Sequence, residues 1–163
     1  MTEEKKDFFV SDISLSYQYT AGNATTRFLN KVAEGKLVAQ KCPKCSAVYV
    51  PPRGSCPRCG VATEEELELP DTGAVESFTI VHIPIPGNPI VPPYVSAMIR
   101  LDGADISFLH LIQEIDLADI RIGMRVQAVW KDKSDWGTTL ENIKWFKPTG
   151  EDDVDPSLFK FKE

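Results

Sequence analysis

The sequence contains little cysteine and histidine, and it has no long hydrophobic run. Of 163 residues, four are cysteine and two are histidine. No stretch approaches the roughly 18–20 apolar residues that a membrane-spanning helix requires. Residues 1–7 are too charged to resemble the start of a secretory signal, and no apolar segment follows them. We therefore expect a cytoplasmic protein with no membrane span, whose thiols stay reduced.

The sequence also lacks the common catalytic signatures. It has no nucleophile elbow, phosphate-binding loop, HExxH zinc motif or dinucleotide-binding fingerprint. His82 and His110 stand at the ends of predicted strands without a nucleophile motif nearby, and a lone histidine in a β pattern is more often packed or exposed than a base. Asp102 and Asp105 flank a turn, where turn chemistry accounts for them. We do not expect the chain to be an enzyme on its own.

All four cysteines lie in two CxxC pairs that are separated by ten residues. Four thiolates in two tight turns match the tetrahedral shell of a structural Zn²⁺. Gly60 follows the second pair, where such a knuckle needs a backbone without the constraint of a Cβ atom. A shell of four thiolates leaves no position for water or substrate. We predict a small zinc ribbon with a structural metal and these ligands: Cys42, Cys45, Cys56 and Cys59.

Other uses of the cysteines stay open. Two disulfides are possible in an exported chain, but no export signal is recognisable. Iron or an iron–sulfur cluster also takes four thiolates. A thioredoxin-like redox motif needs one CxxC at a strand-to-helix turn rather than two in tandem. Zinc fits the pattern best.

Charge is distributed unevenly along the chain, whose net charge is −6. Residues 1–69 carry 9 basic and 9 acidic side chains, and residues 70–163 carry 9 basic and 15 acidic ones. Between residues 35 and 63 there is no acidic residue, so five cations with four thiolates and one Zn²⁺ (net −2) leave a charge of +3. This surface either offsets the thiolate charge or binds an anion. The five cations are Lys36, Lys41, Lys44, Arg53 and Arg58.

The N-terminal part predicts a polar segment followed by a short helix. Residues 1–16 are polar and mixed, with Phe8, Phe9 and Val10 as residues that could dock elsewhere. Apolar residues between 17 and 34 have the spacing of an amphipathic helix. We expect a cap at Asn23 or Thr25 and an end at Gly35. The apolar residues of this helix are Phe28, Leu29 and Val32.

The rest of the chain predicts strands. Two ribbon strands are expected at 36–41 and 47–53, and an acidic linker at 64–68 follows. Five further strands are indicated at 74–82, 94–101, 106–111, 124–131 and 142–147, with a helical turn at 116–122. Asp102-Gly103 is a tight-hairpin signal. Five short strands with a small helix between the third and fourth are typical of an OB-fold barrel.

The predicted fold class is therefore mainly β with an N-terminal helix, in which a rubredoxin-like zinc ribbon precedes a five-stranded OB-fold barrel. The expected parts are an N-terminal helical segment (1–35), the ribbon and its linker (36–69), the OB-fold (70–148) and a C-terminal tail (149–163).

Two segments outside the regular elements are distinctive. The loop at 83–93 holds five of the twelve prolines and several branched aliphatic residues. It either folds back over the barrel or forms a stiff apolar rim for a ligand or a partner. The tail at 151–163 is acidic and then amphipathic, which fits a docking peptide or a frayed terminus.

Several short motifs resemble the DUF35 family. They are Glu34-Gly35-Lys36-Leu37, the run from Gln40 to Cys45, Tyr49-Val50-Pro51-Pro52-Arg53 and the run from Cys56 to Gly60. The resemblance covers about residues 25–147. It implies a helical segment, a zinc ribbon and an OB-fold in a non-catalytic protein associated with acyl-CoA metabolism. Members of the family are found beside thiolases or hydroxymethylglutaryl-CoA synthases, or fused to hydratase-like and lipid-transfer-like partners. In archaeal thiolase–synthase assemblies the resemblance implies a scaffold that holds the two enzymes and shares a CoA site.

The resemblance makes a CoA thioester the expected ligand and a thiolase-like or other acyl-CoA-processing enzyme the expected partner. In such a complex the cations Lys44, Arg53 and Arg58 of the acid-free segment would meet the phosphates of CoA. Tyr49 or Phe28 would stack on the adenine. The apolar loop, including Ile85 and Ile90, would line the path of the pantetheine or acyl chain.

Two further functions are compatible with the sequence. One is a single-stranded nucleic-acid-binding module, since OB-folds bind strands through aromatic platforms and a basic groove. The aromatic candidates are Phe78, Phe108, Trp130, Trp136 and Trp145. However, residues 70–147 carry 7 basic and 10 acidic side chains, and this acidic balance argues against nucleic acid as the partner. The other is an assembly subunit without a ligand, docked through the proline loop or the tail.

Overall fold

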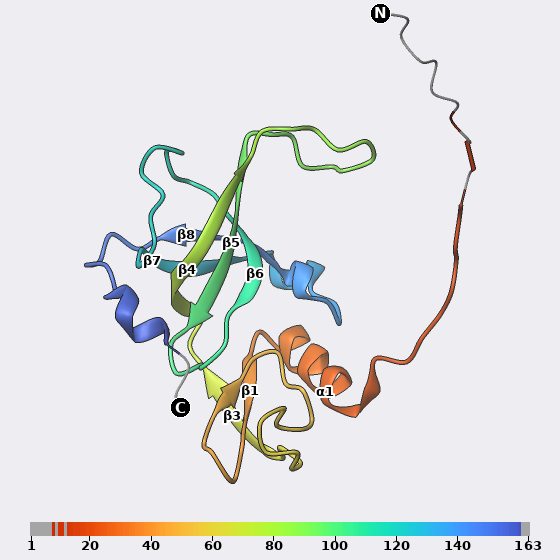
Figure 1. The fold of residues 1–163 in the computed structure, drawn as a ribbon, viewed down its shortest axis with the longest axis vertical. Helices are drawn as coiled ribbons and strands as arrows, with labels where there is room; N and C mark the ends of the chain where they lie inside the picture. The colour runs from red at the N-terminus through yellow and green to blue at the C-terminus, as the bar shows by residue number, and fades with distance from the viewer. Residues whose placement is uncertain (1–7, 9, 12, 161–163) are drawn as a thin grey trace, which may run out of the picture.

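The computed structural model describes residues 8, 10, 11 and 13–160, and Figure 1 shows their arrangement. The helix and the ribbon lie at one end of the molecule, and a barrel forms the other end. Among the described residues, no helix has the length and apolar character needed to cross a membrane. The regular elements are α1 (Gly22–Ala33), β1 (Leu37–Lys41), β2 (Val48–Tyr49), β3 (Glu65–Leu69), β4 (Thr72–Val81), β5 (Tyr94–Leu101), β6 (Phe108–Ile112), β7 (Arg125–Trp130) and β8 (Ile143–Pro148).

Helix α1 buries the face that its apolar spacing predicts, with Phe28 and Val32 in the core. It ends at Gly35, as predicted, because this residue takes the left-handed conformation (φ 79°) and closes a Schellman motif. The Lys36 amide donates to the Lys31 carbonyl at 2.9 Å, and the Gly35 amide donates to the Val32 carbonyl at 3.0 Å. The prediction for the start is wrong. The helix begins after Ala21 without a side-chain cap, so both predicted caps, Asn23 and Thr25, lie inside its first turn.

The ribbon contains a three-stranded sheet in the order β2-β1-β3. The predicted acidic linker is wrong, because residues 65–69 form β3, which pairs antiparallel with β1 over five residues. Leu67 and Leu69 pack against the core, while Glu66 and Glu68, which alternate with them, are exposed. Strand β2 comprises only Val48 and Tyr49, so the predicted return strand at 47–53 is much shorter than expected.

The glutamates of β3 form ion pairs with neighbouring cations. Glu68 pairs with Lys36 at 3.3 Å, and Glu65 pairs with Lys41 at 3.9 Å. Two of the five cations in the acid-free segment are therefore partly neutralised by the acidic run that follows it.

The second part of the chain forms the predicted five-stranded barrel. Its strands close in the order β4-β5-β6-β8-β7, which is the order of an OB-fold. Closure depends on one parallel pair between β6 and β8, Ile112 with Phe146. The segment at 116–122 holds a hydrogen-bonded turn, with Asp119 N donating to the Asp116 carbonyl at 2.9 Å, rather than a helical turn.

One hydrophobic core runs through the helix, the ribbon sheet and the barrel. Phe28 and Val32 of the helix and Leu37 of β1 belong to the same buried cluster as Ile99 and Phe146 of the barrel. The ribbon is therefore packed directly against the barrel, because residues of both belong to one buried apolar cluster.

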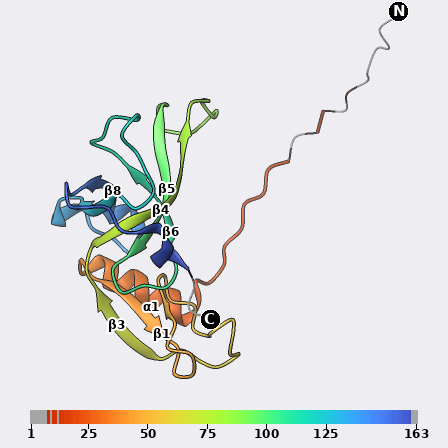
Figure 2. The ribbon, with the colours of Figure 1, turned by 60° about the vertical axis from the view of Figure 1, so that its left-hand side comes forward.

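The proline loop and the tail differ in how they meet the barrel. The β4–β5 hairpin projects from the barrel in Figures 1 and 2, and Ile83, Ile85 and Val91 in its loop are exposed. The tail runs along the barrel. Val154 N donates to the Gly123 carbonyl at 2.8 Å, and the Arg100 guanidinium donates to the carbonyl of Phe159 at 2.6 Å. Up to residue 160, the tail is thus anchored rather than frayed.

Candidate functional site

The first cysteine pair occupies a tight knuckle between β1 and β2. The Cys42 amide donates to the Ala47 carbonyl at 2.9 Å, and the Ser46 amide donates to the Cys42 carbonyl at 2.9 Å. Inside this turn, the amides of Lys44 and Cys45 point to the Cys42 sulfur at 3.4 and 3.5 Å. Backbone N–H groups around a sulfur stabilise its thiolate form.

The second pair repeats this geometry fourteen residues later. The Cys56 amide donates to the Val61 carbonyl at 2.8 Å, and the Gly60 amide donates to the Cys56 carbonyl at 2.9 Å. Ser46 and Gly60 occupy the same place in their knuckles, and both are left-handed, with φ of 60° and 65°. Gly60 thus has a conformation that favours a residue without a Cβ atom, although Ser46 shows that a side chain is tolerated at this place.

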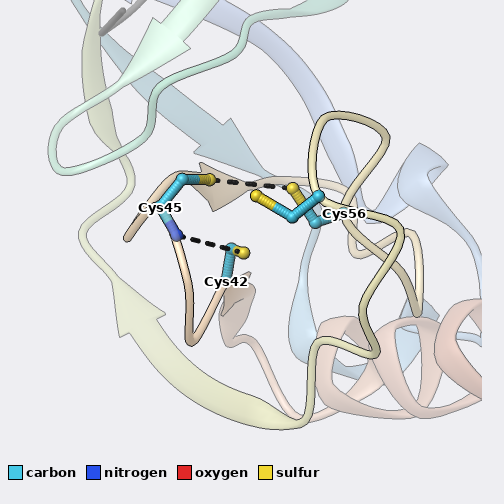
Figure 3. A group of neighbouring side chains, drawn as sticks. Cys42, Cys45 and Cys56 are labelled. Atoms are coloured by element: carbon cyan, nitrogen blue, oxygen red, sulfur yellow. Dashed lines mark hydrogen bonds between the residues drawn. The ribbon is translucent and has the colours of Figure 1, made fainter.

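The two knuckles bring all four sulfurs together. The ligand atoms of Cys42, Cys45, Cys56 and Cys59 lie within 4.8 Å of one another, and Figure 3 shows the Cys45 and Cys56 sulfurs facing each other at 3.7 Å. A tetrahedral ion with metal–sulfur bonds of about 2.3 Å holds its ligands about 3.8 Å apart. The four thiols are therefore positioned to bind one metal ion.

Tyr49 supports the sulfur cluster from the core. Its ring is 1 % exposed, and its hydroxyl lies 3.3 Å from the Cys56 sulfur. This hydrogen bond is the main reason that the pKa of Cys56 falls to about 6. Burial raises the pKa of Tyr49, so the hydroxyl keeps its proton and acts as the donor to the thiolate.

The sulfurs do not hold their protons equally. Burial is the main cause that raises the pKa of Cys59 to about 12. Without metal, Cys56 is therefore the first of this pair to form a thiolate, and Cys59 keeps its proton at neutral pH. A metal ion bound by all four sulfurs has to displace that proton.

The remaining cations of the ribbon are exposed near the knuckles. Lys44 and Arg58 lie inside the two CxxC turns, and Arg53 lies between them in sequence. The Arg53 guanidinium also stands over the Tyr49 ring, 5.8 Å from its centroid. Three cationic side chains are therefore exposed at this end of the molecule.

The structure does not bring all the predicted ligand residues to one place. Phe28 is 3 % exposed, so it presents no face to an adenine, and the same holds for Tyr49. Ile85 and Ile90 lie on the hairpin loop, at the end of the barrel away from the ribbon in Figures 1 and 2. The ten residues of β4 separate these ends by about 30 Å, at about 3.3 Å per residue.

The aromatic candidates for nucleic-acid stacking are engaged within the chain. Each of the three tryptophans donates its indole N–H to an acceptor in the chain. Trp130 donates to Asp71 at 3.1 Å, Trp136 donates to the Lys131 carbonyl at 2.8 Å, and Trp145 donates to Glu114 at 2.8 Å. Trp130 and Trp136 also contact each other, with ring centroids 5.4 Å apart. Phe108 is buried, whereas Phe78 lies exposed on β4 and is the exception among these candidates.

His110 belongs to the packing of the barrel. Its Nδ1 accepts a hydrogen bond from the Leu111 amide at 2.9 Å, and its ring meets the edges of Phe108 and Phe146. Burial lowers the pKa of His110 below its usual value.

Asp102 is held in an ion pair. Its carboxylate accepts two hydrogen bonds from the Arg125 guanidinium at 2.6 and 2.7 Å, and these bonds lower the pKa of Asp102.

One feature that the sequence reasoning missed is an apolar groove on the barrel. Because β6 and β8 are joined at one pair only, their first residues border a groove of about 420 Å³. Leu109, Leu111 and Ile143 supply its apolar surface, and Lys131 and Lys144 stand among its lining residues. The predicted strand limits contained these residues, but the incomplete pairing was not visible in the sequence.

Comparison with protein families matches two adjoining parts of the chain. Residues 30–65 match the model described as the ChsH2 rubredoxin-like zinc ribbon domain. Residues 66–131 match the ChsH2 C-terminal OB-fold domain.

Two curated proteins are similar in sequence. A DUF35 domain-containing scaffold protein of Methanocaldococcus jannaschii is 37 % identical over 117 residues, which is 69 % of this chain and 81 % of that protein. A probable enoyl-CoA hydratase alpha subunit of Thermomonospora curvata is 34 % identical over 95 residues, which is 58 % of this chain but 29 % of that subunit.

Two solved structures have a similar fold. A DUF35 protein of unknown function from Sulfolobus solfataricus has 28 % identity and a TM-score of 0.56, with 66 % of this chain and 78 % of that chain covered. A chain of the complex described as the Ltp2-ChsH2(DUF35) aldolase has 27 % identity and a TM-score of 0.60, with 80 % of this chain and 98 % of that chain covered.

Proposed function

The chain belongs to the DUF35 family of zinc-ribbon and OB-fold proteins, and from this membership we propose that it is a non-catalytic accessory protein of acyl-CoA metabolism. It binds CoA or a CoA thioester and holds a thiolase-type or related acyl-CoA-processing enzyme. The observation that carries this proposal is the match to a scaffold protein over 81 % of that protein's length.

The other comparisons support an acyl-CoA setting without assigning a reaction. The hydratase subunit is matched over only 29 % of its length, so its activity is not transferred to this chain. The aldolase complex contains a chain that is covered almost completely, at 98 %, which fits a protein that works beside an enzyme.

We assign the metal as a structural Zn²⁺ held by Cys42, Cys45, Cys56 and Cys59. Four sulfur ligands complete the tetrahedral shell and leave no position for water or substrate. The ribbon sheet shares its core with the barrel, so the metal stabilises the surface that a ligand or an enzyme would contact.

The exposed cations of the ribbon are the proposed contacts for the CoA phosphates. Lys44, Arg53 and Arg58 are exposed in and between the two knuckles, where an anionic head group can approach them. Since the hairpin lies at the other end of the barrel, its apolar residues Ile85 and Ile90 are assigned to contact with the enzyme or its acyl substrate rather than with the same CoA head group.

Calorimetric titration of CoA into matched variants tests the ligand surface. We expect the triple variant Lys44→Ala, Arg53→Ala and Arg58→Ala to bind CoA at least about 10-fold more weakly than wild type, because each lost charge-assisted contact contributes to affinity. The variant Lys36→Ala with Lys41→Ala is the control and should bind within about twofold of wild type. Equal affinity in the triple variant would remove these cations from the site.

Purification from native lysate tests the accessory role. The tagged chain should recover an acyl-CoA-processing enzyme in near-stoichiometric amount, with zinc and CoA species detected by mass spectrometry. Recovery of RNA or DNA without such an enzyme would overturn the proposal. It would indicate instead that the barrel binds single-stranded nucleic acid.

A further inference from the structure

In the segment before α1, apolar and polar side chains alternate, although the N-terminal region as a whole is polar. From residue 13 to residue 20, large apolar side chains alternate with small polar ones. We call residues 13–20 the arm. Its apolar members are Ile13, Leu15, Tyr17 and Tyr19, and its polar members are Ser14, Ser16, Gln18 and Thr20. Strict alternation over eight residues is typical of a strand with one buried face.

In the structure this face is formed but not covered. The arm leads away from the body in Figures 1 and 2. All four apolar side chains are at least 75 % exposed. The Tyr17 and Tyr19 rings lie 6.1 Å apart, on the same side of the chain, as side chains two residues apart in an extended strand should.

The sheets of this chain offer few edges to the arm. The barrel strands close into a ring, and the edges that remain where β6 and β8 share one pair border a groove that also carries the charged residues Lys131, Glu141 and Lys144. Strand β2 is only two residues long. The outer edge of β3 carries exposed glutamates at 65, 66 and 68, and the arm has no basic residue to pair with them. A second copy of the chain would present the same edges, so a dimer adds no new kind of edge for the arm.

We propose that the arm is a docking strand that adds to a free sheet edge of the partner enzyme and places its apolar face on an uncharged surface there. Added strands gain affinity from main-chain hydrogen bonds and specificity from alternate side chains. Burial of the four apolar side chains removes on the order of 500 Å² of surface, compared with about 800 Å² per partner in a standard interface. The identity of the partner rests on the proposed function.

The first test uses the purified protein alone. Hydrogen exchange measured by mass spectrometry should show unprotected amides in residues 13–20, because nothing in the free protein covers them. Protection there would mean that the chain itself, for example its β6–β8 groove, or a second copy holds the arm, and it would overturn the proposal. Size-exclusion chromatography of the same sample separates these two cases.

The second test uses the complex with the acyl-CoA enzyme that co-purifies with the full chain. The arm amides should become protected on binding. The apolar-face variant (Leu15→Ser, Tyr17→Ser and Tyr19→Ser) should weaken binding at least 10-fold, and Ser16→Pro, which blocks strand pairing, should also weaken it. The polar-face variant (Ser14→Asn, Ser16→Asn and Gln18→Asn) is the matched control and should bind within about threefold.

The outcomes separate the two proposals. If the enzyme binds both face variants equally well, the arm is not a docking strand, while the accessory function stands. If no acyl-CoA enzyme binds the wild-type chain, the proposed function is wrong and so is the partner assigned to the arm.

Discussion

Val48 of the ribbon and Asp105 of the barrel are joined by two reciprocal hydrogen bonds. The Val48 amide donates to the Asp105 carboxyl oxygen Oδ2 at 2.9 Å, and the Asp105 amide donates to the Val48 carbonyl at 2.9 Å. Both residues are buried. Val48 directly precedes Tyr49, whose hydroxyl contacts the Cys56 sulfur. The sulfur cluster and the barrel are thus connected through two adjacent residues of β2.

Replacement of Asp105 should destabilise the whole protein rather than one part. Asp105→Ala leaves the buried Val48 amide without its acceptor, which costs about 1–3 kcal/mol. Asp105→Asn keeps an acceptor oxygen and should lose less. Urea denaturation followed by tryptophan fluorescence measures the difference, with exposed Asp132→Ala as the control, expected within about 0.5 kcal/mol of wild type. Equal stability of Asp105→Ala and Asp132→Ala would contradict the coupling.

The two knuckles predict opposite effects from matched substitutions. Ser46 has a left-handed backbone (φ 60°), a conformation that costs a residue with a side chain about 1–2 kcal/mol. Ser46→Gly removes this strain and should stabilise the metal-bound ribbon by about 0.5–1 kcal/mol, after the greater chain entropy of glycine is counted. Gly60→Ser introduces the same strain and should destabilise it by a similar amount. Denaturation with saturating zinc checks both, and shifts of the same sign would refute the equivalence of the two turns.

Tyr49→Phe separates support of the metal from its ligation. All four sulfurs remain, but the donor to Cys56 is lost, and loss of such an outer hydrogen bond typically lowers metal affinity 10–100-fold. Cys42→Ser removes a ligand and should lower both bound zinc and the melting temperature. Competition with a chromogenic chelator measures affinity. If Tyr49→Phe bound zinc as tightly as wild type, the hydroxyl would have no role at the metal.

The pH dependence of stability should include a contribution from His110. Burial lowers its pKa in the folded protein, so the unfolded chain binds the proton more readily. The stability is fully present above the unfolded value of about 6.5 and falls as the pH drops below it, by at most about 1.4 kcal/mol per pH unit. Denaturation of zinc-loaded protein from pH 7.5 to 5.5 should show a smaller slope in His110→Gln than in wild type. Equal slopes in the two proteins would mean that His110 makes no contribution to the pH dependence.

Local signals in the sequence predicted the ribbon ligands and the barrel. Each CxxC pair defines a metal-binding turn within a few residues, so the ligands could be predicted locally. The strand limits of the barrel could be predicted from the alternation of apolar and polar residues. Strand β3 was missed because its glutamates suggested a linker, although Leu67 and Leu69 already show the alternation of a strand. The charges that make this run polar are the partners of Lys36 and Lys41, and pairing across the sheet is not visible in one segment alone.

The candidate ligand residues could be predicted less well because burial depends on tertiary packing. Tyr49 and Phe28 are aromatic residues near a basic segment, which suited a stacking role, yet both lie in the core. The hairpin and the ribbon cations carry complementary chemistry for CoA, but β4 holds them at opposite ends of the barrel. Composition identifies what a surface can bind, and only the fold decides which residues share that surface.

Gly35 and Trp136 predict a strongly non-additive pair of substitutions. A Cβ atom on Gly35 would lie 2.5 Å from two carbons of the Trp136 ring. That ring is held by contact with Trp130 and by its bond to the Lys131 carbonyl, so it cannot easily retreat. Gly35→Ala should therefore cost about 1–2 kcal/mol for the left-handed backbone and a further 1–3 kcal/mol for the collision.

A double-mutant cycle distinguishes the two costs. In a Trp136→Ala background the collision is absent, so Gly35→Ala should cost only the backbone part, about 1–2 kcal/mol. The expected interaction energy is at least about 1 kcal/mol, measured by urea denaturation of all four proteins. Additive effects would mean that the ring moves aside at no cost and that glycine is required at position 35 only for its backbone conformation. A positive interaction would show instead that the end of α1 packs specifically against Trp136, and that this contact sets the position of the helix on the barrel.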